Sequence, residues 1–330
     1  MFDVVGVGAN SVDYVYRLPG FPSPDGPLSK LRIAHHAVSP GGQTATTLCA
    51  CVALGLEAAY IGATGNDANG ELIRDELINR GVDVAHVAIR DTSNAFAVIL
   101  LHDAHGERVV LWDRRPELDL EPEEIDPALI RGARVLHVDD VDEGAAIRAA
   151  SIARDAGIPV TSDIERVAQR TDELLGLVTI PIFAEHVLLA LTGERDFEPA
   201  LRAVQERRAS VRAAGTRAGP DTMACVTLGA RGAMLLAGDR IFREPGTPVD
   251  VVDSTGAGDV FRAAFIAALL RGDAPQAILR FANTAAAISC TRPGAIGGVP
   301  TLAEVESLSG RASYRLSSRN PSGGMVNERE

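Results

Sequence analysis

The sequence contains almost no lysine. Lys30 is the only lysine among 32 basic residues, and 44 acidic residues bring the formal net charge to −12 at pH 7. A surface this negative disfavours nucleic acid and anionic membranes as partners. No apolar run approaches the ~20 residues that a membrane-spanning helix requires. The chain starts with a strand-like run at residues 4–7 in place of a signal peptide, so we expect a cytoplasmic protein.

Cysteine pairs and the familiar nucleotide-binding loops are absent as well. No two cysteines have Cys-x-x-Cys spacing, which disfavours a zinc site or a disulfide framework and favours reduced thiols. There is no Gly-x-x-x-x-Gly-Lys-Ser/Thr loop and no Gly-x-Gly-x-x-Gly loop after a strand, and Gly6-Val-Gly8 is too short to count. The chain is therefore not a P-loop enzyme, and an NAD-dependent oxidoreductase is disfavoured. The cysteines are Cys49, Cys51, Cys225 and Cys290.

What the sequence has instead is a regular alternation of short apolar runs and helical patterns. Such βαβ alternation predicts an α/β fold, with a mostly parallel sheet covered by helices on both faces. The expected strands are 3–8, 58–62, 134–138, 158–162, 178–184, 222–228 and 232–236, and the expected helices are 43–54, 69–80, 145–156, 198–214, 258–271 and 274–289.

Three segments depart from this alternation. Residues 11–38 and 95–113 read as strands without intervening helices, and the second has a hairpin pattern with a turn at Asp103-Ala-His-Gly106. Residues 311–330 have little apolar content and are predicted to be a disordered tail. We therefore expect one large domain over residues 1–310, with a small separate β-structure built from the two strand-only segments.

The most informative stretch is residues 250–265. The β-branched pair Val251-Val252 is expected to end a strand. The small residues Gly256-Ala257-Gly258 are expected to form a turn, and residues 260–270 are expected to form a helix. A glycine-rich turn that leads into a helix leaves N–H groups unpaired at the positive end of the helix dipole, which creates a site for an anion. The carboxylate of Asp259 lies beside this site and could act as the base that takes the proton from an attacking hydroxyl. We expect the helix N-terminus to keep this carboxylate ionised. The residues thus indicate phosphoryl transfer.

This string resembles the C-terminal signature of the PfkB, or ribokinase-like, carbohydrate kinases. Residues 39–47, Ser-Pro-Gly-Gly-Gln-Thr-Ala-Thr-Thr, resemble the segment that lines the sugar pocket in that family, and the likeness extends over about residues 2–308. It implies a three-layer sandwich with a small β-sheet lid over the sugar site, ATP and Mg²⁺ as cofactors, and a homodimer formed through the lid. The implied activity is ATP-dependent phosphotransfer to a hydroxyl of a small sugar.

The resemblance also assigns residues to the sugar side. A carboxylate that accepts two hydroxyl hydrogen bonds suits polyol recognition, and glycines let the backbone pass close to the sugar. Many members of the family carry Asn at the position of Thr46, so the hydroxyl pattern differs here. The expected sugar-binding residues are Asn10, Asp13, Gly41, Gly42, Thr46 and Lys30.

On the nucleotide side, the resemblance implies Thr227, Gly229, Asn283 and Gly294. Asp253 and Thr255 are expected to help bind a monovalent cation such as K⁺, or else to form a turn-stabilising Asx/ST motif. The family often has Asn-x-x-Glu before its Leu-Thr-Gly turn, but residues 184–187 read Ala-Glu-His-Val. Glu185 is the expected Mg²⁺ contact there, acting through water, since Mg²⁺ keeps several waters.

The substrate class stays open. Lys30, Arg32, Arg114 and Arg115 would suit a phosphorylated or sulfonated sugar, whereas the carboxylates of Asp139-Asp140-Val-Asp142 would repel one, which favours a neutral pentose or ketohexose. Lys30 aligns with a basic lid residue of the sulfofructose-kinase-like members that the C-terminal third resembles. Phe96 and Trp112 would allow stacking on a nucleoside base. A catalytically silent sugar- or nucleotide-binding protein is the alternative that the missing Asn-x-x-Glu motif motivates.

Overall fold

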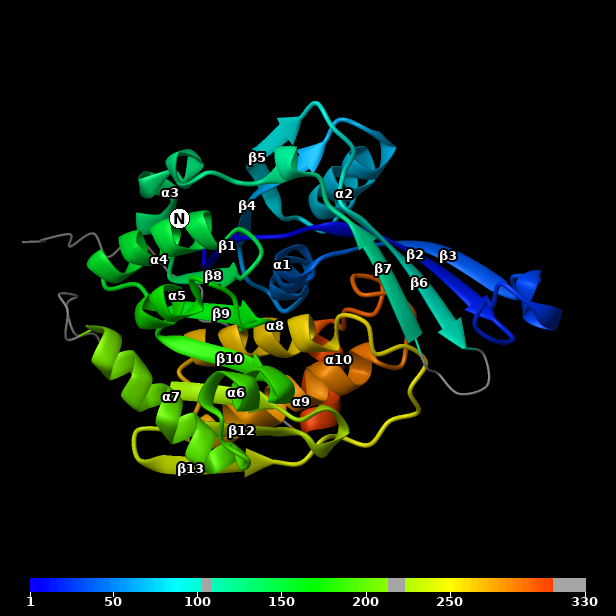
Figure 1. Cartoon of the computed structure of the whole chain (residues 1–330). Coiled ribbons are helices and arrows are strands. Elements are labelled where there is room, and N and C mark those ends of the chain that lie inside the picture. The colour runs from blue at the N-terminus through cyan, green and yellow to red at the C-terminus, as the bar shows by residue number, and fades with distance from the viewer. Residues whose placement is uncertain (103–107, 213–222, 311–330) are drawn as a thin grey trace, which may run out of the picture.

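A computed structural model describes residues 1–102, 108–212 and 223–310. Nine strands form the large sheet, in the order β13-β12-β11-β10-β9-β8-β1-β4-β5 (Figure 1). All neighbouring strands from β5 to β11 run parallel, whereas β12 and β13 are antiparallel at one edge. The bounds are β1 Val4–Val7, β4 Ala58–Gly65, β5 Asp83–Arg90, β8 Val135–Asp139, β9 Val160–Ile164, β10 Ile180–Ala184, β11 Met223–Thr227, β12 Ala233–Ala237 and β13 Arg240–Glu244.

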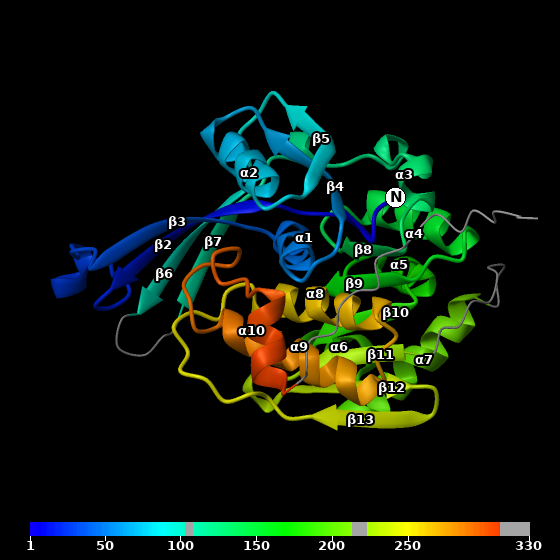
Figure 2. The same cartoon turned by 180° about the vertical axis from the view of Figure 1, so that it is seen from behind.

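Helices cover both faces of this sheet, so the predicted α/β three-layer architecture is confirmed (Figures 1 and 2). On one face, α1 (Gln43–Ala53), α2 (Ala68–Asn79), α8 (Ala257–Leu270), α9 (Pro275–Ser289) and α10 (Leu302–Ser309) share one buried apolar cluster. On the other face, two clusters join the sheet to α3 (Pro127–Arg131), α4 (Glu143–Asp155), α5 (Thr171–Leu177), α6 (Glu185–Thr192) and α7 (Phe197–Arg212). None of the helices that the structure describes is both long and apolar enough to cross a membrane.

A separate four-stranded sheet projects from one end of the large sheet (Figure 1). Its order is β3-β2-β6-β7, with bounds β2 Ser11–Leu18, β3 His35–Gly41, β6 Phe96–His102 and β7 Arg108–Asp113. The predicted hairpin is confirmed, since β6 pairs antiparallel with β7, whereas its turn at 103–106 lies outside the described residues. β7 is an edge strand with exposed apolar side chains, Trp112 above all at 71 %.

The sequence-based prediction fails at several places. Val251-Val252 does not end a strand but lies in an irregular connection, where Val251 is 65 % exposed. β-branched residues favour a strand only when a partner strand pairs with them, and among the described residues no strand pairs with these two. The unpredicted strands β5 and β13 lie at the two edges of the large sheet. The predicted tail at 311–330 lies outside the described residues.

Candidate active site

The residues predicted to form an anion site lie at the start of α8. Gly256 adopts the left-handed conformation at φ +77° and caps the helix, which places Asp259 in its first turn. A Cβ on Gly256 would stand 2.8 Å from both Cα and Cβ of Ala295, so the position requires glycine for its conformation and for its packing. The Ala257 N–H is engaged by the Ser254 carbonyl at 3.3 Å. If this turn binds an anion, as predicted, N–H groups other than that of Ala257 would have to hold it.

Two cavities meet at this turn. The first, of about 800 Å³, lies under the small sheet and is lined by Asn10, Asp13, Gln43 and Asp259 among others. The second, of about 620 Å³, lies between α9 and the loop after β13. Ser254 and Gly258 line both cavities. The turn is thus the shared wall between two cavities, which we call, after the roles predicted from the sequence, the acceptor cavity and the nucleotide cavity.

Asn10 is held at the acceptor cavity by a buried amide network. Its Nδ2 donates to the Tyr60 hydroxyl at 3.0 Å and to the Ala63 carbonyl at 2.7 Å, and its Oδ1 accepts from Asn94 Nδ2 at 3.0 Å. Burial raises the pKa of Tyr60, whose hydroxyl donates to the Gly8 carbonyl at 2.8 Å. These bonds fix the orientation of the Asn10 amide. The sequence reasoning missed Asn94, which lies in a loop.

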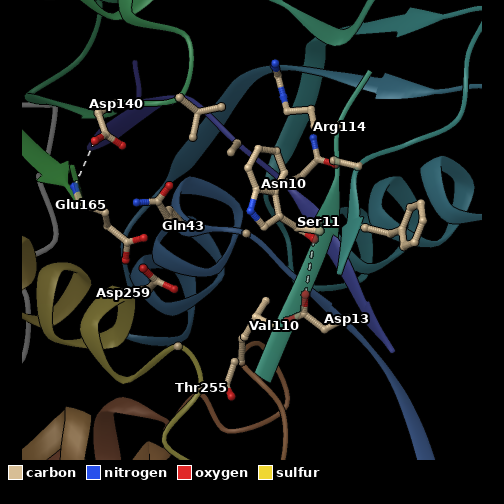
Figure 3. A pocket seen from close by; sticks show the side chains of 18 of the residues that line it. Asn10, Ser11, Asp13, Gln43, Val110, Arg114, Asp140, Glu165, Thr255 and Asp259 are labelled. Atoms are coloured by element: carbon tan, nitrogen blue, oxygen red, sulfur yellow. Dashed lines mark hydrogen bonds between the residues drawn. The ribbon is translucent and has the colours of Figure 1, made fainter. Parts of the chain in front are cut away.

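The other residues predicted for the sugar side separate into two groups. Asp13 and Gly42 line the acceptor cavity together with Asn10, and Gly41 packs behind them, where a Cβ would meet Asp13 Oδ2 at 3.2 Å. Thr46 is fully buried inside α1 and does not line the cavity. Lys30 lies exposed beyond the β2 strand of the small sheet and does not line it either. Gln43 takes the place at the cavity that the sequence reasoning gave to Thr46 (Figure 3).

Carboxylates gather where β8 and β9 end. Asp139 accepts hydrogen bonds from Ala9 N at 2.6 Å and Thr44 Oγ1 at 2.7 Å, yet burial raises its pKa to about 6. Burial likewise raises the pKa of Asp140 to about 6, and Asp140 accepts from the N–H of Glu165 at 3.1 Å. In Figure 3, Glu165, Asp259 and Gln43 lie together on one side of the cavity.

Asp259 does not have the environment that the sequence predicted for it. The helix N-terminus was expected to favour the ionised form, but burial, followed by the nearby Asp163 carboxylate, raises the pKa of Asp259 well above its usual range. The Arg262 guanidinium opposes this shift. A raised pKa makes the carboxylate a stronger base once it is ionised.

The nucleotide cavity brings together three of the four residues predicted for it. Thr227, Gly229 and Asn283 line it, and Asn283 Nδ2 donates to the carbonyls of Glu244 and Pro245 at 3.1 and 3.2 Å, which holds the loop after β13 against α9. Gly294 does not line this cavity. It lies on the far side of the 251–255 loop, where its N–H donates to Asp253.

Comparisons with known proteins identify the family of the chain. The family model for pfkB family carbohydrate kinases matches residues 1–302. The chain belongs to this family. The ATP-dependent ribose-1-phosphate kinase of Halopiger xanaduensis is 31 % identical over 89 % of this chain and 94 % of that protein. The ribokinase of Haemophilus influenzae is 27 % identical over 90 % of this chain and 95 % of that protein. The structure of Arabidopsis thaliana ribokinase complexed with ribose and ATP superposes with a TM-score of 0.76 at 25 % identity, covering 94 % of this chain and 99 % of that one.

In this pfkB-family carbohydrate kinase, Asp253 stabilises the loop that precedes the turn. Its Oδ1 accepts from Thr255 N and its Oδ2 from Gly294 N, each at 2.9 Å. The bond from Thr255 N is the Asx-type motif that the sequence gave as one of two roles, and the bond from Gly294 N links this loop to a distant segment. The second role, monovalent cation binding by Asp253 and Thr255, stays a prediction.

The residue predicted for magnesium lies on the nucleotide side of the kinase. Glu185 begins α6 and pairs with Arg231, next to Gly229 and Ala230 of the nucleotide cavity. Within the described ranges, no cluster of three or more His, Cys, Asp or Glu side chains is arranged to hold a metal ion. The assignment of Glu185 to Mg²⁺ stays a prediction.

The basic residues considered for a charged sugar are mostly remote or already paired. Arg114 lines the acceptor cavity, but its Nη2 donates to both oxygens of Asp142 at 2.8 and 2.9 Å. Arg32 and Arg115 are exposed and do not line the cavity. Phe96 and Trp112 do line it. Arg166, which the sequence reasoning did not consider, also lines it and donates to the Asp140 carbonyl at 3.3 Å.

Proposed function

We propose that this protein is an ATP-dependent kinase of a small neutral sugar, a pentose or a ketohexose. One observation carries the proposal: two cavities open on opposite sides of the turn at 254–258, and the carboxylate of Asp259 lines the one that contains Asn10 and Asp13. ATP in the nucleotide cavity would point its γ-phosphoryl group at the turn. A sugar in the acceptor cavity would approach the same group from the other side.

In the proposed reaction, Asp259 accepts the proton of the attacking sugar hydroxyl. The sugar oxygen forms a bond to the γ-phosphorus while the bond from that phosphorus to the β,γ-bridging oxygen breaks, and ADP leaves with the electron pair. The Gly256, Ala257 and Gly258 turn stabilises the negative charge on the transferring group. Loss of one such donor typically costs about 3 kcal/mol, or roughly a hundredfold in rate.

Mg²⁺ would accompany ATP and neutralise charge on its phosphates. Bound in this way, Mg²⁺ keeps several waters and needs only one or two protein carboxylates. Two carboxylates lie on the two sides of the turn and could contact Mg²⁺. Glu185 lies beside the nucleotide cavity, and Glu165 lies beside Asp259 in the acceptor cavity. The loop held by Asp253 is the proposed place for a monovalent cation such as K⁺.

The charge of the acceptor cavity favours a neutral substrate. Six carboxylates line it, and two of its three arginines, Arg114 and Arg262, are paired with buried carboxylates. Carboxylates accept hydrogen bonds from sugar hydroxyls, and amides both accept and donate them. The carboxylates would repel a second anionic group on the substrate. The six are Asp13, Asp113, Asp119, Asp140, Glu165 and Asp259.

A sugar phosphate is the second candidate, on the strength of Arg166. Arg166 lines the acceptor cavity, and an arginine can hold a phosphate group in two-point contact. A relative at 31 % identity is a ribose-1-phosphate kinase. Assembly of two chains through the small sheet also remains a proposal, supported by the exposed apolar residues of β7.

The test is ADP release from Mg²⁺–ATP with KCl, measured against a panel of sugars, sugar phosphates and nucleosides. We expect release that depends on a neutral sugar and falls by about 10²- to 10⁴-fold in Asp259→Asn, the usual contribution of a general base. Asp250→Asn, at an exposed position in the preceding loop, is the matched control and should retain activity. Release only with a sugar phosphate, lost in Arg166→Ala, would instead support the second candidate. ATP binding without release for any acceptor would overturn the proposal in favour of a silent binding protein.

A further inference from the structure

Trp112 is the only tryptophan of the chain, and most of its side chain is exposed. It lies on β7, the edge strand of the small sheet, where it lines the acceptor cavity. A tryptophan side chain carries a large apolar surface, which folded proteins usually pack away from water. An indole that stays open to a cavity is therefore available to the molecule that the cavity binds.

The pairing of the strands places Trp112 in the same row as the carboxylate of Asp13. Trp112 pairs with Ala97 of β6, and Ala97 pairs with Asp13 of β2. Residues that pair directly across neighbouring strands have their side chains on the same face of the sheet. Asp13, Ala97 and Trp112 thus form one row, and its two outer members both line the acceptor cavity.

The width of this row suits a sugar ring. Neighbouring strands lie about 4.8 Å apart, so β2 and β7, with β6 between them, lie about 10 Å apart. In this row β6 contributes only the methyl group of Ala97. The next row on the same face consists of Val15, Ile99 and Val110, and Val110 also lines the cavity. The β7 side of the space is therefore apolar at two successive inward positions, 110 and 112.

Both ends of the row are held in place by their neighbours. The hydroxyl of Ser11 donates to Asp13 Oδ1 at 3.3 Å (Figure 3). On β7, Arg114 follows Trp112 by two residues, and its Nη2 donates to both oxygens of Asp142 at 2.8 and 2.9 Å. Asp142 has a buried side chain and directly precedes α4, which packs on the large sheet. The segment that carries Trp112 is thereby tied to the large sheet.

The two ends of the row offer two different kinds of contact. The carboxylate of Asp13 accepts hydrogen bonds from hydroxyl groups. The face of the Trp112 indole carries partial negative charge, which attracts the C–H groups that a sugar ring presents on its less hydroxylated face. A nucleoside base could also stack on an indole, but a flat base offers fewer hydrogen-bond donors than a polyol to the carboxylates of this cavity.

We propose that Trp112 is a specificity-determining residue that stacks on the C–H face of the acceptor sugar, while Asp13 binds hydroxyls of the same sugar. This inference rests on the proposed function and names the form of sugar that the cavity selects. A closed ring presents its C–H groups on one rigid face, whereas an open-chain polyol of the same carbon number does not. Trp112 therefore favours ring-closed sugars over the corresponding open-chain alcohols.

The kinetic experiment uses ribose and fructose as acceptors, with ribitol and sorbitol as their open-chain competitors. Trp112→Leu keeps an apolar side chain but loses the flat face, so kcat/KM for the sugar should fall by about tenfold, the upper size of one aromatic contact. The loss should appear in KM with kcat nearly unchanged, because stacking holds the substrate and the transition state alike. Trp112→Phe should lose less, and the inhibition constants of the two alcohols should change little in both variants.

Leu111→Ala is the matched control. Leu111 directly precedes Trp112 on β7 and is 55 % exposed, and its side chain lies on the opposite face of the small sheet. This variant should leave KM for the sugar unchanged. An equal rise of KM in Leu111→Ala, or no rise in Trp112→Leu, would overturn the inference. Circular dichroism confirms that each variant is folded, which is expected because both side chains are mostly exposed.

Tryptophan fluorescence separates this inference from the proposed function, because all tryptophan emission of the full chain comes from Trp112. Ribose or fructose, added in the presence of ADP, should shift the emission to shorter wavelength and protect the indole from quenching by acrylamide, since the sugar covers an exposed ring. If ADP release depends on the sugar but the emission does not change at sugar concentrations above KM, the proposed function stands and the inference fails.

The other outcomes are equally distinct. If no acceptor supports ADP release but ribose or fructose shifts the emission, the stacking contact stands and the proposed function fails. If neither release nor an emission change occurs, both are refuted. An emission change with nucleosides and with neither sugar would also overturn the inference, because the indole would then bind a base.

Discussion

Gly256→Ala should affect both the stability of the protein and its catalytic rate, and the two effects can be measured separately. Gly256 has φ +77°, where an alanine costs about 1–2 kcal/mol. The new Cβ would also stand 2.8 Å from Cα and Cβ of Ala295, so either the turn or the 295 segment must shift. The turn is the shared wall of the two cavities. Its displacement should therefore impair chemistry and not only stability.

Gly272→Ala is the matched control for this substitution. Gly272 lies just after α8, the helix that Gly256 begins, and has nearly the same backbone, φ +76°, but a Cβ there would meet nothing within 4 Å. Both variants should lose about 1–2 kcal/mol of unfolding free energy from the backbone alone, and Gly256→Ala should lose more because of the clash. Urea titration followed by circular dichroism measures this difference.

The two variants should differ most in their kinetics. A turn that loses one well-placed donor should lower kcat by about a hundredfold, which corresponds to roughly 3 kcal/mol of transition-state stabilisation. Gly272→Ala should keep kcat and KM close to the wild type. If Gly256→Ala loses no more stability than Gly272→Ala and retains kcat within threefold, the turn does not hold the transferring group and the reasoning is wrong.

Three further variants test other parts of the structure. Asn94→Ala removes the donor to Asn10 Oδ1 and should raise KM for the sugar while changing KM for ATP little, in steady-state kinetics. Ala287→Leu places a larger side chain in the nucleotide cavity. It should raise KM for ATP and change KM for the sugar little. Burial lowers the pKa of His137 to about 3 in the folded chain, below the ordinary value of 6.5. As the pH falls below 6.5, the unfolded chain therefore binds a proton that the folded chain does not, and the free energy of unfolding falls by about 1.4 kcal/mol per pH unit. His137→Gln should lose less stability than the wild type between pH 7 and 5 in urea titrations, and parallel curves would show that His137 titrates normally.

Regular periodicity made most of the fold predictable from the sequence. The apolar runs of β1, β4 and β8 to β12 and the apolar faces of α1, α8 and α9 become buried, which is why their residues are patterned so clearly. β5 is an edge strand with exposed polar positions, so its sequence gives no such signal. Val251-Val252 shows the opposite error, because strand-forming residues alone do not provide a partner strand.

The candidate site was predictable only where a residue's role follows from its immediate neighbours in the chain. Gly256 and Asp259 are only three positions apart, and Gly256 forms a turn as expected, whereas Ala257 and Gly258, which were predicted to belong to the turn, already begin α8. Arg262, by contrast, forms an ion pair with Asp163, which lies 99 positions earlier in the sequence. An arginine three residues after Asp259 in an apolar run is a signal that could have been noticed, but its partner could not. Asn94 and Gln43 likewise depend on how separate elements meet.

The link between the two sheets has a mechanical consequence. β1 ends at Val7 and β2 begins at Ser11, so only three residues, Gly8 to Asn10, join the large sheet to the small one at this point. Ala9 is tied to Asp139 on the large sheet, and Asn10 to Tyr60 and Ala63 of β4. The large-sheet side of the link therefore fixes Asn10, whereas Asp13 belongs to β2 of the small sheet. A sugar that contacts both residues, as the proposed function requires, would bridge the two sheets across this short link.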